Sequence, residues 1–187
     1  MIQSDKFDSF NMDIKKITHN ILLFVVNRLI EISAIFLSLL SFLLFVALIS
    51  YSPEDPNFIF SEGKEIKNLL GFQGSFTSDI FLQSIGLISY LVSISYFFLG
   101  LNLFIKKKFL LIIESTFFTI LYSIFGSLFL SHFYKDNLTL HINGNGGFVG
   151  NFLDNTFLNN LITTYENIFF YSLVLIVIIL FLKSINF

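Results

Sequence analysis

Four long apolar runs constrain the fold of this chain more than any other feature of its sequence. They cover residues 29–49, 80–105, 109–133 and 167–182, and polar segments separate them. A helix needs roughly 20 mostly apolar residues to cross about 30 Å of hydrocarbon. The first three runs meet that length. The fourth is shorter, about 24 Å as a helix, but Tyr165 and Lys183 flank it and can reach the two interfaces. We therefore predict an all-α membrane protein with four transmembrane helices.

Composition supports this prediction. The 187 residues are 55% hydrophobic with a mean hydropathy of +0.79, too apolar for an ordinary soluble domain and too long for a single anchor. The chain has no cysteine, which excludes disulfides, thiolate metal sites and cysteine nucleophiles.

The first 27 residues differ in composition from the apolar runs and are predicted to form a separate segment. They mix basic and acidic side chains, as expected of a solvated tail: Lys6, Lys15, Lys16, Asp5, Asp8 and Asp13. Residues 21–26 are apolar but too short to span, and no small-residue cleavage site follows them at signal-peptide spacing. We predict a cytoplasmic tail over residues 1–27 with a lead-in helix at the membrane surface and no removable targeting peptide. A four-transmembrane anchor domain then covers residues 28–187.

The basic residues predict the orientation. If both termini lie in the cytoplasm, eight of the eleven basic residues fall on that side: Lys6, Lys15, Lys16, Arg28, Lys106, Lys107, Lys108 and Lys183. This is the distribution that the positive-inside rule describes. The Lys106–Lys108 run could instead bind nucleic acid or anionic lipid, but its place between two spans favours a topology signal. The two longer loops are then predicted to be periplasmic.

Residues 50–57 end the first apolar run. Pro53 and Pro56 lack amide hydrogens and disfavour helix in the residues before them. Glu54 and Asp55 must reach water, and Tyr51 stands where an aromatic ring would mark the lipid boundary. By itself, this stretch is compatible with a turn after any transmembrane helix.

Small and polar residues recur at two further places. The segment with Asn68, Gly71, Gly74 and Asp79 predicts a structured loop that enters the second span. In the third span, a small polar residue recurs every four positions, which predicts a helix–helix contact face: Ser115, Thr119, Ser123, Ser127 and Ser131.

A glycine-rich run at residues 144–150 opens the second half of the loop between the third and fourth spans. It is followed by a weakly amphipathic pattern, in which Val149, Phe152, Leu153 and Leu161 oppose Asn151, Asp154, Asn155 and Asn159. We predict one short helix there, resting on the membrane surface or tucked into the mouth of the bundle. The run is not a nucleotide-binding loop, since Val149 replaces the third glycine of the dinucleotide fingerprint and no Gly-Lys-Ser/Thr follows.

Taken in order, these features resemble the N-terminal four-transmembrane region of the FtsK/SpoIIIE DNA translocases. The resemblance covers residues 28–182. The residues that carry it are expected to be structural or interaction positions: Arg28, Glu31, Ser50, Tyr51, Ser52, Pro53, Asp55, Pro56, Asn68, Gly71, Gly74, Asp79, Gly86, Gly146, Gly147 and Gly150. Ser75 and Ser78 stand where alanines are expected and Asn57 where serine is common, which are small exchanges.

The resemblance implies an anchor in the bacterial inner (plasma) membrane at the division septum, in a protein of cell division and chromosome segregation. It implies a homo-oligomer in the lipid bilayer that contacts other septal membrane proteins. Complete members continue into a cytoplasmic ATPase that pumps double-stranded DNA. This chain has no Walker loop and no basic DNA-binding surface. We therefore expect no catalytic residue, no metal, no cofactor (ATP and magnesium belong to the motor) and no direct nucleic-acid contact. The chain is either the anchor portion of a longer translocase or a free-standing anchor.

Two other classes of membrane protein are also compatible with the sequence. A small transporter or channel subunit would use Glu31 and Glu114, although Glu114, about one turn inside the third span, can also snorkel toward the lysines. A membrane sensor would bind a ligand in its loops. His132 and His141 are candidates there, but no matching Cys or carboxylate pattern supports a metal site.

Overall fold

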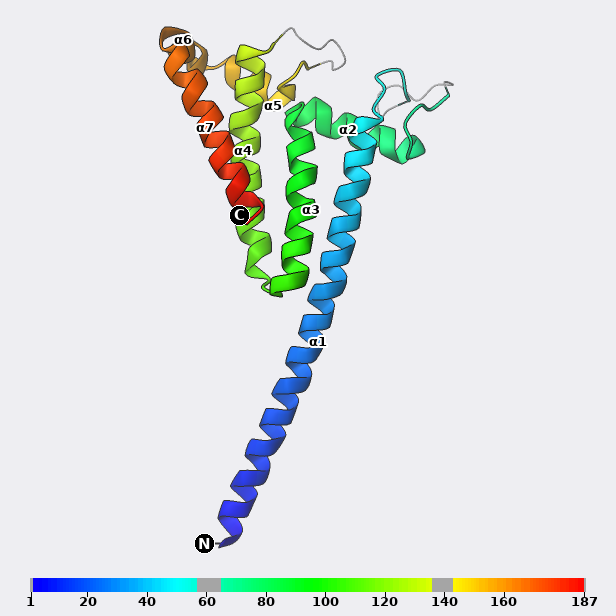
Figure 1. Cartoon of the computed structure of the whole chain (residues 1–187), viewed down its shortest axis with the longest axis vertical. Helices are drawn as coiled ribbons and strands as arrows, with labels where there is room; N and C mark the ends of the chain where they lie inside the picture. Colours follow the sequence, from blue (N-terminus) through cyan, green and yellow to red (C-terminus); the bar gives the residue numbers. More distant parts are fainter. Residues whose placement is uncertain (1, 57–64, 136–142, 187) are drawn as a thin grey trace.

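The computed structural model describes residues 2–56, 65–135 and 143–186, with side chains from residue 15 onward. These ranges contain seven α-helices and no strand (Figure 1). The helices are α1 (Ile2–Ile49), α2 (Gly71–Ile85), α3 (Ile88–Lys106), α4 (Leu110–Phe133), α5 (Gly147–Asp154), α6 (Phe157–Thr164) and α7 (Glu166–Ser184).

Four of these helices are long and apolar enough to cross a membrane: α1 over Lys15–Ile49, α3, α4 and α7. They pack side by side in the order α1, α3, α4 and α7 (Figure 1). Where α1 meets α3, Gly100 lies against Ala34 and Ser38, and the missing side chain permits this close approach. The prediction of an all-α chain with four spanning-length helices is confirmed for the described residues.

The bundle has two different ends (Figure 1). At one end, which we call the loop end, residues 50–56, 65–87 and 143–165 gather with α2, α5 and α6. At the other, which we call the basic end, α3 ends at Lys106, and a short turn that contains Lys107 and Lys108 joins it to α4. Lys107 adopts a left-handed conformation (φ 53°) in this turn and meets α1 at Glu31.

Helix α1 differs from the prediction of a surface lead-in helix followed by a separate span. It is one continuous helix of 48 residues that extends well past the turn between α3 and α4 (Figure 1). The physical reason is that residues 2–49 contain neither proline nor glycine, so nothing interrupts the backbone hydrogen bonds. The apolar residues 21–26 therefore continue the line of the span beyond the basic end.

The second span begins at Ile88, whereas the sequence pattern placed its start at residue 80. Residues 80–85 belong to α2, which lies across the loop end (Figure 1). Gly86 turns the chain between α2 and α3 with φ 63°, a conformation that glycine adopts without a steric penalty. Hydropathy does not reveal this break, because the residues on both sides of the glycine are apolar.

The single short helix predicted after the glycine run is two helices, α5 and α6. Thr156 separates them and caps α6 by accepting a hydrogen bond from Leu158 N (3.3 Å). In α5, the predicted apolar face is exposed and part of the predicted polar face is buried. Phe152 is 62% exposed, whereas Asp154, which the pattern placed on the polar face, is only 4% exposed. The glycines and polar groups of α5 pack against α4, and its aromatic face points away.

The interior of the bundle is rich in small polar groups. The hydroxyl of Ser95 hydrogen-bonds both Tyr122 and Ser184, at 2.8 Å each, and these bonds link α3, α4 and α7. Many large apolar side chains point outward instead, for example Phe36, Leu39 and Ile113. This arrangement suits a helix bundle in lipid, where small residues and interhelical hydrogen bonds make the contacts.

Candidate functional site at the loop end

The proline stretch after α1 is tied to the residues that precede α2. The Asp55 carboxylate, 3% exposed, accepts hydrogen bonds from two successive backbone amides, Lys67 N (2.9 Å) and Asn68 N (2.8 Å). The carbonyl of Pro56 accepts a further bond from the Ser75 hydroxyl (3.0 Å). Asp55 thus joins two segments that are 12 residues apart in the sequence.

Asn68 connects the same segment back to α1. Its Nδ2 donates to the Ala47 carbonyl (2.9 Å), in the last turn of α1, where carbonyls have no partner within the helix. Its Oδ1 accepts from Leu70 N (3.0 Å). Gly74 lies directly against the Asn68 side chain, and a Cβ at Gly74 would overlap that amide. The close approach explains why glycine is required here.

Ser50 and Tyr51 add two more bonds across this junction. The Ser50 hydroxyl accepts from Leu69 N (3.2 Å), and the Tyr51 hydroxyl donates to Asp79 Oδ1 in α2 (3.0 Å). Burial, together with the charge of Asp79, raises the pKa of Tyr51 above its ordinary value. The phenol therefore stays protonated and remains a donor to Asp79.

The rest of the proline stretch is at the surface. Ser52 Oγ accepts from Glu54 N (3.4 Å), and Pro53 is exposed. Glu54 forms an exposed ion pair with Lys67 (2.6 Å), and this contact raises the pKa of Lys67. This outer layer accompanies the buried bonds of Asp55 and Asn68 but does not connect helices.

A second junction joins the α2–α3 turn to the segment before α5. The carbonyl of Asn145 accepts a hydrogen bond from Leu87 N (2.9 Å) and lies so close to Gly86 that a Cβ there would overlap it. Gly147 closes the contact from the other side, since a Cβ at Gly147 would lie 2.5 Å from Gly86 N and 2.7 Å from Ile85 N. Two glycines from distant parts of the sequence therefore pack backbone against backbone.

The start of α5 packs in the same way against α4. Gly146 and Gly150 face Ser127 and Ser131, where a Cβ on either glycine would overlap the backbone or hydroxyl of these serines. Ser127 also donates to the Ile85 carbonyl (3.0 Å), which connects α4 to α2. The structure buries the whole small polar stripe of α4: Ser115, Thr119, Ser123, Ser127 and Ser131.

Two asparagines, Asn145 and Asn151, join these contacts but were not among the predicted motif positions. Asn145 Nδ2 donates to the Tyr134 carbonyl (2.5 Å). Asn151 accepts from Ser131 (3.1 Å) and donates to the Asn143 carbonyl (2.6 Å). Side-chain amides both donate and accept, so several of them beside a glycine run were a usable signal of a bonded loop.

A side-chain contact between α4 and α5 was missed as well. His132 Nδ1 lies 2.7 Å from Asp154 Oδ1, and Lys135 Nζ lies 3.9 Å from the other carboxylate oxygen. His132 was considered as a metal ligand, but the described residues contain no group of three or more side chains that could hold a metal ion. His141 lies outside the described residues.

Arg28 and Glu31 do not join the other motif residues. Glu31 lies at the basic end and forms ion pairs with Arg28 and with Lys107 (2.5 Å to Lys107). Glu114 is exposed on α4. The structure thus places Arg28 and Glu31 at the basic end and the remaining motif positions at the loop end.

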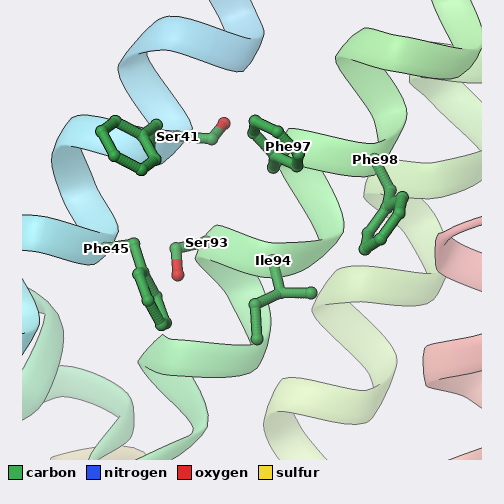
Figure 2. Close-up of a pocket in the computed structure, with 7 residues that line it drawn as sticks. Ser41, Phe45, Ser93, Ile94, Phe97 and Phe98 are labelled. Carbon is green, nitrogen blue, oxygen red and sulfur yellow. The ribbon is translucent and has the colours of Figure 1, made fainter.

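A groove between α1 and α3 is the cavity shown in Figure 2. It holds about 290 Å³ and is lined almost entirely by apolar surface. Its lining residues are Ser41, Phe42, Phe45, Ser93, Ile94, Phe97 and Phe98. The lining contains no acidic or basic side chain, and its only hydroxyl groups belong to Ser41 and Ser93. The Ser41 hydroxyl donates a hydrogen bond to the Leu37 carbonyl of its own helix (2.7 Å).

These features define a class of protein: a polytopic helical membrane protein. In its described residues, hydrogen bonds and backbone contacts join the loops to the helix ends at the loop end. The comparison with protein families goes further. The model of the 4TM region of DNA translocase FtsK/SpoIIIE matches residues 26–185. The chain therefore belongs to this family, as its motifs predicted. No curated protein and no solved structure matches the chain. The family describes the membrane region of the translocase rather than its motor.

Proposed function

We propose that this chain is the membrane anchor and septal interaction domain of a bacterial DNA translocase that acts in cell division and chromosome segregation. The observation that carries the proposal is the family match over residues 26–185, together with the two junctions that the motif residues form at the loop end. An anchor must hold its loops in a constant arrangement while a motor pulls on it. Buried hydrogen bonds and backbone contacts between distant segments provide such an arrangement.

The proposed orientation follows from the positive-inside rule. The basic end lies in the cytoplasm of a bacterial inner membrane, and the loop end lies in the periplasm, where it contacts other septal membrane proteins. The domain acts as a homo-oligomer, uses no cofactor of its own and does not contact DNA. Alkaline phosphatase fused after Lys107 should be inactive, whereas a fusion after Asn145 should be active. High activity at Lys107 would reverse the orientation.

Localisation tests the proposed role in the septum. A fluorescent fusion of the chain should concentrate at the division site of a rod-shaped bacterium. Gly147→Ala should disperse that signal over the membrane, because Gly147 has φ 66° and no room for a Cβ. Gly144→Ala is the matched control: it has φ 69°, but its Cβ would make only an ordinary contact, 3.6 Å from the Lys135 carbonyl.

The transporter or channel alternative predicts different results. It requires uniform membrane distribution and a proton-coupled flux that is lost in Glu114→Gln. No contact in the described structure joins Glu31 to Glu114, and Glu31 is already paired with two cations. A septal signal that Gly147→Ala disperses and Glu114→Gln leaves unchanged supports the anchor, and the opposite pattern supports the transporter.

A further inference from the structure

A second groove lies at the basic end, where α1, α3 and α4 meet. It holds about 290 Å³, and its walls are apolar. The lining residues are Val26, Leu29, Ile30 and Ser33 from α1, Leu103 from α3, Phe109 from the turn before α4, and Ile112 from α4. Nothing in the proposed function uses this groove.

Cations lie in the segment that joins two walls of the groove. Lys106, Lys107 and Lys108 stand between the lining residues Leu103 and Phe109. Glu31 is the acid that pairs with them, and it contacts Arg28 and Lys107. Lys106 and Lys108 are exposed and have no ion pair within the part of the chain that the structure describes. The rim therefore carries an excess of positive charge.

The turn between α3 and α4 keeps the charges beside the groove. Lys107 turns the chain with φ 53°, and its ion pair with Glu31 (2.5 Å) holds the turn against α1. Because Phe109 follows Lys108 directly, the lysine backbone and the apolar wall are parts of the same short segment. A ligand in the groove would thus meet hydrocarbon-like surface below and cations at the rim.

We propose that the groove at the basic end binds an anionic phospholipid, with an acyl chain in the groove and the headgroup phosphate at Lys106 and Lys108. Charge complementarity selects this occupant, since basic pockets between transmembrane helices suit anionic headgroups. A zwitterionic lipid would bring its own cation among the lysines. The groove of Figure 2 is a natural comparison, because it has a similar volume but no cation in the segments that line it, residues 41–45 and 93–98. The inference does not depend on the proposed role in division.

The test uses the purified full chain in detergent micelles, titrated with phosphatidylglycerol or with phosphatidylcholine of identical acyl chains. Native mass spectrometry counts the bound lipid, and the unfolding temperature is followed in parallel. Phosphatidylglycerol should bind and raise the unfolding temperature. Phosphatidylcholine should bind more weakly and raise the unfolding temperature less. Equal effects of the two lipids would overturn the proposal. So would a full shift produced by inorganic phosphate alone, because the ligand would then be a free anion.

Variants locate the site. Lys106→Gln with Lys108→Gln should weaken phosphatidylglycerol binding on the order of tenfold, since each basic residue contributes to attraction at an anionic surface. The matched control is Lys15→Gln with Lys16→Gln, which removes the same charge from exposed positions of α1 away from the groove. Equal weakening by the two pairs would show diffuse attraction and overturn a defined site.

The acyl chain is tested separately. Ser33→Trp should fill the groove and reduce binding, whereas Ser41→Trp, in the groove of Figure 2, should not. Circular dichroism checks that each variant keeps its helix content. Should Ser33→Trp fail to fold, the exposed lysine pair still decides the question. Unchanged binding in a folded Ser33→Trp would overturn the acyl part of the site.

Discussion

The loop end and the basic end both bring distant parts of the chain together, but they do so by different interactions. At the loop end, the polar groups are buried: Asp55, Asn68, Asn145 and Asp154 are all nearly inaccessible, and glycines let backbones touch. At the basic end, the side chains of Arg28 and Lys107 are 57% and 40% exposed. A buried hydrogen bond leaves an unsatisfied group when it is broken, whereas an exposed ion pair exchanges its partner for water. The loop end should therefore tolerate substitution far less than the basic end.

The contact between Gly86 and Asn145 should be the most sensitive position. Gly86→Ala should lower the free energy of unfolding by about 3 kcal/mol, because it combines a strained φ with overlap on a backbone carbonyl. Denaturant unfolding in mixed micelles measures this loss. Gly71→Ala is the control, since Gly71 has φ 66° but open space around a Cβ, and it should cost only about 1 kcal/mol. Equal losses would show that backbone strain, rather than close contact, matters at the loop end.

The Asp55 carboxylate should come next. Asp55→Ala leaves the amides of Lys67 and Asn68 without their acceptor and should cost about 2 kcal/mol in the same measurement. Glu54→Ala, the neighbouring exposed acid, should leave the unfolding midpoint almost unchanged. The explanation fails if the two substitutions have similar effects.

A smaller loss is expected for the hydroxyl that connects α4 to α2. Ser127→Ala removes the bond to the Ile85 carbonyl but keeps the close packing, so it should cost about 0.6 kcal/mol. Ser172→Ala is a suitable control, because Ser172 donates to Phe169 on its own helix. A loss comparable to that of Asp55→Ala would mean that this single hydroxyl bond stabilises the loop end as much as the buried carboxylate does.

The basic end should respond least. Lys107→Gln removes the ion pair with Glu31, but Glu31 keeps Arg28 as a partner and solvent reaches the site. The unfolding midpoint should change less than in Gly86→Ala, Asp55→Ala or Ser127→Ala, and added salt should reduce the difference further. A midpoint shift as large as that of Asp55→Ala would remove the distinction between the two ends.

Hydropathy was sufficient to predict the four spanning helices, because hydrocarbon requires long apolar segments with satisfied backbone groups. It could not place the start of α3, since the break at Gly86 lies inside an apolar run and depends on one positive φ. It also could not show the continuity of α1, where residues 21–26 are too few to span but do not interrupt a helix. For short segments, the average polarity does not distinguish a helix end from a helix interior.

The motif residues were found in order, but not their partners. Asn68 and Ala47 are 21 residues apart, and Gly86 and Asn145 meet only after α3 and α4 have been placed. Asp154 was assigned to the polar face of a helix, but the pattern does not show that this face contacts His132. The direction that a short helix faces depends on the tertiary contact, which periodicity does not contain.

The unbroken course of α1 has a mechanical consequence. A helix of 48 residues is about 72 Å long, and without a hinge it transmits axial load and rotation along its whole length. Its last turn is held by the Asn68 amide at Ala47, so a displacement applied near Lys15 would be delivered to the loop end rather than absorbed on the way. Helix α1 thereby couples its N-terminal part mechanically to the loop end.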